Sequence, residues 1–243
     1  MLVTDDVEVN LNTILKFIAH AARRKCDIVC FPEVCLVNNE KHVVPIEPHL
    51  KAIQSQCKKV SIWCIFGSYQ KERSRIRNFA YLIDNTGLLT YRYAKVHLWK
   101  TEVDHGIVPG RTTRTIQTRL GKIGLIICFD FAFPSFVRKL ALQGAEVIFC
   151  PSFMVDYAGW EEMLRTMPLM RAFENTAYFV YCDAVTVDKR TAAMSCIAGP
   201  EGIISSIDEL PGMIVETLDL KRIRRLRDDF RILRGTSVAT RRR

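Results

Sequence analysis

Residues 121–134 read GKIGLIICFDFAFP, and this stretch indicates the fold class of the chain. Its apolar run has the length of a buried strand and falls well short of the ~18–20 residues that a membrane-spanning helix needs. The run ends in Cys128 and Asp130, and Pro134 follows. In α/β proteins, functional side chains gather where buried strands end. We therefore expect an α/β fold with a thiol at the end of a central strand.

Helical and strand patterns alternate on both sides of this stretch. Apolar residues at helical spacing run from Leu11 to Ala22, with Asp5 or Asp6 available as the cap, and a second helical pattern spans Trp160–Asn175. Strands are predicted near residues 26–31, 61–69, 78–93, 145–150, 178–185 and 203–207, the third being a hairpin turned at residues 85–87. Between two of them, Ser135 is the expected cap of a short helix that Gly144 ends. This alternation predicts helices layered on sheets.

Two segments of the chain repeat one pattern. Residues 26–33 read CDIVCFPE and residues 145–152 read AEVIFCPS. Each follows a helical pattern, passes an acidic residue and an apolar strand, and breaks at a proline, which indicates two equivalent halves. The last positions differ, because the first copy ends in Glu33 and the second in Ser152. We expect the halves to share their structure but only one of them to carry a carboxylate here.

Length and cysteine content restrict the class of protein. A chain of 243 residues, about half of them apolar, can bury one sizeable core. Nine cysteines without a short, loop-rich framework favour reduced thiols and a cytoplasmic protein. The opening residues MLVTDDVEVN show neither the basic nor the apolar region of a signal peptide.

The formal net charge of +9 is concentrated near the end of the chain. Residues 221–243 contain ten Lys and Arg against two Asp, so the other 220 residues carry about one net positive charge. Such basic blocks are usually solvated or interaction tails, which makes nucleic acid an unlikely partner for the body of the protein. We predict a single domain over residues 1–234 and a basic tail over residues 235–243.

Three side chains stand where they can do chemistry, although none is specific by itself. Cysteine is among the most buried residue types, so a core role is the ordinary interpretation of Cys128; beside a base, however, its thiolate is a nucleophile. Most carboxylates that follow a strand are solvated, but at the rim of a core the pKa of Glu33 is raised and the group becomes a usable base. A lone lysine such as Lys95 is usually a surface charge.

The order and surroundings of these residues are specific. The chain carries Glu33 in F-P-E, Lys95 in Y-x-K-x-H-L and Cys128 in G-x-I-G-x-x-I-C-x-D-x-x-F-P. Together with VPG at 108–110, RAFEN at 171–175 and SCIAGPEG at 195–202, they resemble the nitrilase or carbon–nitrogen hydrolase superfamily from about Asp6 to Arg234. The resemblance implies a four-layer αββα sandwich of two pseudo-equivalent halves. The sequence departs from the family at its start, where the usual first strand, of the K-I-A-x-x-Q kind, is expected to be lacking.

The resemblance also assigns roles. Glu33 is the expected general base, Lys95 the stabiliser of the oxyanion together with the backbone N–H of Phe129, and Cys128 the nucleophile that forms a thioester. Glu102 is the expected supporting carboxylate, with Asp104 as the competing candidate. No metal or cofactor is predicted, since the sequence has no C-x-x-C, no H-E-x-x-H and no glycine-rich phosphate loop. Ser135 stands where the family usually has glutamate.

The substrate class follows from the same resemblance. Phe129 and Asp130 follow the cysteine, where true nitrilases tend to carry Trp-Glu, so a small amide or an N-carbamoyl compound is expected rather than a nitrile. Asp130 either fixes the turn after the cysteine or takes a direct part in the reaction. The expected substrate-binding side chains are Phe129, Phe133, Tyr157 and Trp160, with Met154 beside them, although aromatic residues at such spacing are more often plain core.

Assembly and the competing functions complete the expectations. The resemblance favours a homodimer or larger homo-oligomer, with an apolar face formed by Met163, Leu164, Met167 and Met170, although these side chains equally suit packing on their own sheet. A catalytically silent member that binds a partner is one alternative, and a nucleic-acid-associated protein led by its basic tail is another. The complete Glu–Lys–Cys set argues against the first, and the near-neutral body argues against the second.

Overall fold

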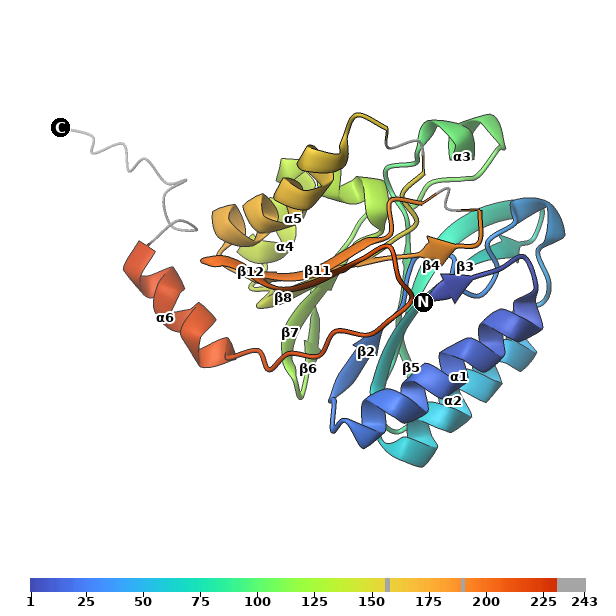
Figure 1. Cartoon of the computed structure of the whole chain (residues 1–243), viewed down its shortest axis with the longest axis horizontal. Coiled ribbons are helices and arrows are strands. Elements are labelled where there is room, and N and C mark those ends of the chain that lie inside the picture. The colour runs from blue at the N-terminus through green and yellow to red at the C-terminus, as the bar shows by residue number, and fades with distance from the viewer. Residues whose placement is uncertain (156–157, 189–190, 231–243) are drawn as a thin grey trace.

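The structure is a computed structural model that describes residues 1–155, 158–188 and 191–230. Two sheets lie face to face, and helices cover the outer face of each (Figure 1). The predicted αββα sandwich is therefore confirmed. Within the described residues, no helix has the length and hydropathy needed to cross a bilayer.

The first half of the sandwich is built by residues 7–94. Its sheet has the order β2-β3-β4-β5, with β2 Ile28–Cys30, β3 Trp63–Glu72, β4 Arg75–Ile83 and β5 Leu89–Ala94. The helices α1 Val7–Arg23 and α2 Glu47–Val60 pack on its outer face. Asp6 caps α1 by accepting hydrogen bonds from the N–H groups of Glu8 and Val9 at 2.9 and 3.1 Å. This half matches the predicted helix, strands and hairpin.

The second half follows the same plan with more strands. Its sheet has the order β12-β11-β9-β8-β7-β6, comprising β6 Ile116–Thr118, β7 Gly121–Leu125, β8 Val147–Ser152, β9 Tyr178–Asp183, β11 Met194–Gly199 and β12 Gly202–Asp208. The helices α4 Pro134–Leu142 and α5 Glu161–Asn175 cover its outer face (Figure 1). Side chains of β3, β4 and β5 pack directly against those of β7 and β8, so one core lies between the sheets.

The repeated pattern in the sequence marks equivalent strands. β2 pairs in parallel with β3, and β8 pairs in parallel with β9. The ends of the two copies meet, because the N–H of Glu33 donates to the carbonyl oxygen of Ser152 at 3.3 Å. The two positions that differ between the halves are thus neighbours at one end of the sandwich.

A strand of two residues lies near the start of the chain, although no strand was expected there. β1, Leu2–Val3, pairs in parallel with β10, Val185–Thr186. The strand then stops because the N–H of Thr4 turns to the side chain of Asn10 at 2.9 Å, directly before α1 begins. A strand of two residues has no detectable period, which explains why the sequence pattern missed it.

Two further expectations need correction. Ser135 does not cap α4, because the helix begins at Pro134 after the cap residue Phe133; proline fits this first position since it has no N–H to satisfy. Gly144 follows the end of this helix with a φ of +92°, as expected of a helix stop.

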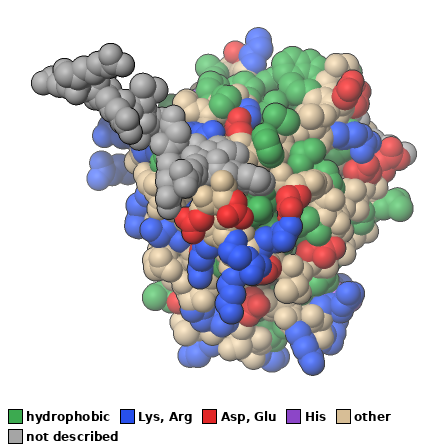
Figure 2. All heavy atoms as spheres, turned by 90° about the vertical axis from the view of Figure 1, so that its left-hand side faces the viewer, with side chains coloured by type: hydrophobic (Ala, Val, Ile, Leu, Met, Phe, Trp, Pro, Cys, Tyr) green, Lys and Arg blue, Asp and Glu red, His purple; other side chains and the backbone are tan. Residues whose placement is uncertain are grey.

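The basic segment is also more ordered than expected. Residues Leu220–Phe230 form α6, whose Ile223 is fully buried. Arg224 binds Glu146 at 2.6 Å, and Nε of Arg227 donates to the carbonyl of Thr176 at 2.9 Å. On the face that carries α6, basic and acidic side chains are interspersed (Figure 2). This part of the chain is a docked helix, while the predicted tail over residues 235–243 lies outside the described residues.

Candidate active site

Four of the side chains singled out in the sequence meet in one buried cluster. Glu33, Lys95, Glu102 and Cys128 are each 2–6% exposed. The ammonium of Lys95 lies 2.7 Å from Oε1 of Glu33 and 2.7 Å from Oε2 of Glu102. The Cys128 thiol lies beside Glu33, close enough for the two groups to shift each other's pKa. Charges this deeply buried are tolerated only when they are paired, and here one cation is shared by two anions.

Glu33 and Lys95 follow strands of the first half. Glu33 follows β2 in a segment that presses on Gly67, where an added Cβ would lie 2.5 Å from the backbone nitrogen of Val34. Lys95 follows β5, and its backbone is held by Asn78 and Gly110 at 2.9 and 2.7 Å. Glycine at position 67 therefore permits the close approach that brings the loop carrying Glu33 against β3.

Glu102 lies on the short helix α3, Lys100–Asp104. Its Oε2 accepts a hydrogen bond from the backbone N–H of Trp99 at 2.9 Å, so the side chain reaches back to the start of its own helix. Asp104, the competing candidate, is instead paired with Lys100 at 2.5 Å on the surface. Of the two candidates, Glu102 is thus the one whose side chain joins the cluster.

Cys128 stands at a sharp turn between β7 and a short 3-10 helix, Cys128–Ala132. Its φ is +44°, a left-handed conformation that costs a residue with a Cβ about 1–2 kcal/mol. Such strain persists only where the surroundings fix the backbone. The residues around the turn must therefore hold its backbone in this conformation.

Asp130 supplies much of that fixing. It is fully buried and accepts hydrogen bonds from the N–H of Ile127 at 3.0 Å, the N–H of His97 at 2.8 Å and the hydroxyl of Tyr93 at 2.5 Å. These contacts tie the cysteine turn to the loop that carries Lys95. Of the two roles open to Asp130 from the sequence, its contacts support fixing the turn.

Asn78 belongs to the cluster and was not found from the sequence. This residue of β4 is 1% exposed, and its amide nitrogen donates to Glu33 at 2.6 Å and to Glu102 at 2.8 Å. The other oxygen of Glu33 accepts a hydrogen bond from the N–H of Phe153 at 2.8 Å. The polar residue at the start of the apolar strand pattern NFAYLI is the signal that could have pointed to Asn78.

The two carboxylates differ in their pKa values. Burial raises the pKa of Glu33, and this effect outweighs the opposing charge of Lys95. Burial acts in the same sense on Glu102, but the charge of Lys95 and hydrogen bonds from Lys95, Asn78 and the N–H of Trp99 outweigh it and lower the pKa. Two carboxyl groups with separated pKa values suit different tasks, one moving a proton and the other holding a charge.

The thiol and the ammonium are also shifted. Burial and the charge of Glu33 raise the pKa of Cys128 well above its ordinary value, although Lys95 opposes this. Burial acts to lower the pKa of Lys95, but the two carboxylates outweigh it and raise the pKa well above its ordinary value. The resting cluster therefore holds a neutral thiol beside a lysine that stays charged.

The expected substrate-binding side chains are only partly brought together. Phe129, Trp160 and Met154 line a cavity of about 40 Å³ beside the turn, together with Trp99, Phe131, Ala132, Met163, Leu164 and Met167. Phe133 is not among the lining residues and stacks on His97 with ring centroids 3.7 Å apart. Tyr157 lies outside the described residues.

Comparison with known proteins identifies the family of the chain. The family model described as carbon–nitrogen hydrolase matches residues 2–228. A probable nitrilase of Schizosaccharomyces pombe is 28% identical over 93% of this chain and 88% of its own length. The deaminated glutathione amidase of Bos taurus is 26% identical over 92% of this chain and 76% of its own length.

Solved structures share the fold. Saccharomyces cerevisiae Nit3, a member of branch 10 of the nitrilase superfamily, superposes with a TM-score of 0.85 at 22% identity, covering 100% of this chain and 93% of that one. An amidase from Nesterenkonia sp., whose active-site cysteine carries a Michael adduct of acrylamide, gives a TM-score of 0.81 at 20% identity and 95% coverage of both chains. The resemblance drawn from the motifs is confirmed. The chain belongs to the carbon–nitrogen hydrolase family and is a hydrolase of carbon–nitrogen bonds other than peptide bonds.

Proposed function

We propose that this protein hydrolyses a small amide through a thioester on Cys128. One observation carries the proposal: a buried thiol lies beside the carboxylate Glu33, which shares the charge of Lys95 with a second carboxylate. A base, a cation and a nucleophile within contact of each other form the set that acyl transfer through a cysteine requires.

The first step is proton transfer from the thiol. Because the pKa of Cys128 is raised, the thiol does not ionise by itself near neutral pH. Glu33, whose own pKa is raised by burial, is well matched to take the proton as the sulfur attacks the carbonyl carbon of the amide. The same carboxyl then gives the proton to the departing amine, which leaves an acyl thioester on Cys128.

Water completes the cycle. Glu33, again unprotonated, takes a proton from a water molecule that attacks the thioester carbonyl, and the thiol of Cys128 is restored when the acid leaves. The carboxylate thus acts twice as a base and twice as an acid. Its hydrogen bonds from Asn78 and from the N–H of Phe153 hold it in one orientation throughout.

Lys95 and Glu102 support these steps electrostatically. Lys95 keeps its proton and supplies positive charge where the tetrahedral oxyanion develops, with the backbone N–H of Phe129 as the second donor. Glu102, whose lowered pKa keeps it ionised, balances the charge of Lys95 and fixes its position at 2.7 Å. Asn78 links both carboxylates and is a positioning residue.

An amide is the favoured substrate class, with N-carbamoyl compounds as the second choice. The support is the pair Phe129-Asp130 after the cysteine and the names of relatives such as the deaminated glutathione amidases of Bos taurus and of Synechocystis. The cavity of about 40 Å³ beside the turn favours a small acyl group.

Ammonia release from a panel of short aliphatic amides, ω-amido acids and N-carbamoyl amino acids tests the proposal. We expect turnover of at least one amide by the purified protein and none by Cys128→Ala. Cys26→Ala is the matched control, because Cys26 is a half-buried cysteine outside the cluster and should keep full activity. Equal turnover by the wild type and Cys128→Ala would overturn the mechanism, and a folded protein inactive on the whole panel would favour the silent alternative.

A further inference from the structure

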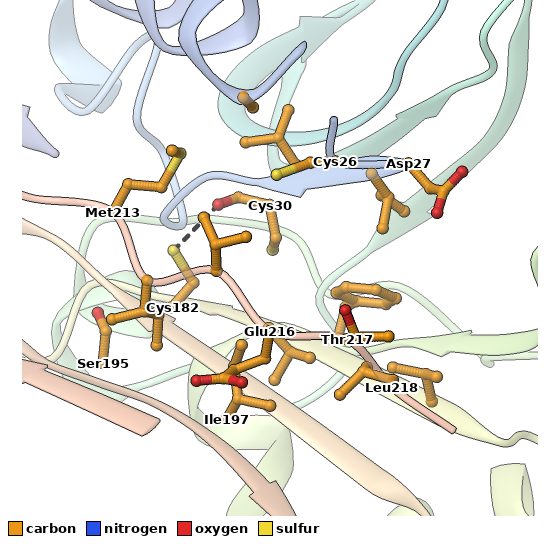
Figure 3. Close-up of a pocket in the computed structure, with 18 of the residues that line it drawn as sticks. Cys26, Asp27, Cys30, Cys182, Ser195, Ile197, Met213, Glu216, Thr217 and Leu218 are labelled. Carbon is orange, nitrogen blue, oxygen red and sulfur yellow. Dashed lines mark hydrogen bonds between the residues drawn. The ribbon is translucent and has the colours of Figure 1, made fainter. Parts of the chain in front are cut away.

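A cavity of about 530 Å³ lies away from the Cys128 cluster, beside the free edge of β2. Among the described strands, β2 pairs with β3 alone, while β1 pairs with β10. Residues 211–219, which form no strand, run along the opposite side of the cavity and supply Met213 and Leu218 to its wall (Figure 3). The cavity thus lies between the two sheets.

Two cysteines meet on the wall of this cavity. Cys30 ends β2 in one sheet, and Cys182 lies in β9 of the other. The thiol of Cys182 donates to the carbonyl oxygen of Cys30 at 3.3 Å (Figure 3), and the two thiols are close enough for each to shift the pKa of the other. Both residues are half-buried. The pair therefore bridges the two sheets and faces a space that small molecules can enter.

A second pair of thiols lies close together but cannot be reached from the cavity. Cys57 of α2 and Cys64 of β3 also lie close together, so that Cys57 raises the pKa of Cys64, but both are fully buried under the helices of the first half. Cys26 is accessible from the cavity, which it lines, but among the described residues no other thiol shifts its pKa. Only Cys30 and Cys182 combine both properties in the described part of the chain.

The two thiols of the pair are not equivalent. The hydrogen bond from Cys30 lowers the pKa of Cys182, whereas burial raises the pKa of Cys30. A thiolate is the species that attacks an oxidant. Cys182 is thus the attacking partner, and Cys30 is placed to resolve the product.

We propose that Cys30 and Cys182 form a modification site, a dithiol that a hydroperoxide converts into a disulfide linking the two sheets. The sulfur of Cys182 attacks one oxygen of hydrogen peroxide and breaks the O–O bond, giving a sulfenic acid and one water. The thiol of Cys30 then displaces the hydroxyl of that sulfenic acid, which forms the S–S bond and releases a second water. The two thiols lose two electrons and two protons, and the peroxide accepts them.

The disulfide has a structural consequence that is independent of catalysis. It joins residues 152 positions apart, so it closes a long loop in the unfolded chain and restricts that state strongly. We expect the oxidised protein to unfold at a temperature roughly 5–10 °C higher than the reduced protein. Forming the bond requires the Cys182 thiol to leave the carbonyl of Cys30, a rotation that the adjoining cavity permits.

Peptide mapping after brief treatment with hydrogen peroxide tests the proposal. The remaining thiols are blocked with N-ethylmaleimide, and the digest is compared with and without reductant. We expect one linked pair of peptides, containing Cys30 and Cys182, in the wild type and in Cys26→Ser. Cys30→Ser should instead accumulate a sulfenic acid at Cys182 that dimedone traps, and Cys182→Ser should leave Cys30 unoxidised.

The buried pair provides the internal control. Cys57 and Cys64 should remain free in the native protein and become oxidised only after unfolding. A linked Cys57–Cys64 peptide in native protein, a linkage of Cys30 to any other cysteine, or oxidation of Cys182 without linkage would each overturn the proposal. Since every readout is a mass or an unfolding temperature, the outcome does not depend on the amidase activity proposed above.

Discussion

The two halves of the molecule share a strand plan but divide the chemistry between them. In the first half, the segment after β2 ends in Glu33, and the segment after β5 adds Lys95 and, on α3, Glu102. In the second half, the equivalent strand β8 ends in Ser152, while β7 leads to Cys128. The halves meet where Glu33 donates to Ser152 and accepts from Phe153. A repeated fold can thus bring a base from one copy to a nucleophile from the other.

Ser152 shows what the equivalent position does without a carboxylate. It is fully buried, and its hydroxyl donates to the carbonyl of Cys150 in its own strand at 3.3 Å. Its partner across the sheet is Asp183, which receives hydrogen bonds from backbone N–H groups. The polar groups at this end satisfy the backbone of the second half, whereas Glu33 satisfies both the backbone and the Cys128 cluster.

The sharpest way to break this comparison is to alter both equivalent positions. We expect Glu33→Gln to lower kcat by roughly a thousandfold, because the amide cannot take the thiol proton, and Ser152→Ala to lower it less than severalfold. The free energy of unfolding of Glu33→Gln near neutral pH should not fall by much, since the raised pKa means that the charged carboxylate is disfavoured in the folded state. Similar losses of kcat in both variants would mean that the two halves are not divided in this way.

Substitution of Asn78 tests whether the first half also sets the pKa of Glu33, its proposed base. We expect Asn78→Ala to lower kcat about 10–100-fold and to move the acidic limb of the pH–rate profile to higher pH. The reason is that the lost hydrogen bond favours the charged form of Glu33, so its removal raises the pKa of that carboxyl further. Asn78→Ser, which keeps a shorter donor, is the control and should recover part of both effects. A drop in kcat with an unmoved pH profile would indicate a merely structural residue.

The motifs were sufficient to find the part of the site that local patterns encode. Glu33, Lys95 and Cys128 were identified because each stands in a short run of characteristic residues, and Glu102 was the best match among the carboxylates after the lysine. Alternating helix and strand periods predicted helices layered on sheets, whereas the αββα sandwich followed from the resemblance to the family. Asn78 has no such run, and its role arises only when β4 lies between two loops. The contact of Cys30 with Cys182 is of the same kind, because it joins strands of different sheets that no local pattern connects.

Three errors of local structure have equally specific causes. Pro134 starts α4 in place of the expected cap Ser135, because proline satisfies the first helical position without a donor. The two residues of β1 are too few to show a period. In α6 the density of arginines suggested a solvated tail, although Ile223 is buried and Arg227 binds backbone carbonyls. Charge is a poor guide where long side chains find acceptors on the protein itself.

The outer helical faces of the two halves also differ, which bears on assembly. On α4, α5 and the residue before α5, large apolar side chains are 44–54% exposed: Leu142, Trp160, Met170 and Phe173. On α1 and α2 only Val9 is comparably exposed. The predicted methionine face is reduced, because Leu164 is buried and Met163 and Met167 pack on the core. The outer face formed by α4 and α5 is nonetheless more apolar than the face formed by α1 and α2.

We predict a homodimer through the face of α4 and α5. Light scattering at micromolar concentration should give about 56 kDa, twice the 27.9 kDa of one chain. Phe173→Asp should halve that mass by placing a charge in the contact, whereas Val9→Asp on the other half should leave it unchanged. A wild-type mass of one chain, or a dimer that survives Phe173→Asp and dissociates in Val9→Asp, would contradict the prediction.

The smallest effect concerns stability at the Ser152 end. Burial raises the pKa of Asp183 to about 7, although hydrogen bonds from the N–H groups of Met154, Ala184 and Met194 oppose this. Because the folded state binds this proton more tightly than the unfolded state, the contribution of Asp183 is greatest below its ordinary pKa near 3.8 and is lost as the pH rises through about 7. Urea unfolding at pH 5 and pH 8 should therefore show a larger decrease in the free energy of unfolding for the wild type than for Asp183→Asn, which keeps the oxygen that accepts from Met154 and Ala184. Glu33→Gln is the matched variant in the first half. Because the pKa of Glu33 is also raised, its titration should lower the free energy of unfolding with rising pH in the same way, and Glu33→Gln should remove that contribution. If Asp183→Asn kept the full pH dependence while Glu33→Gln removed it, the titrating carboxyl would belong to the first half alone.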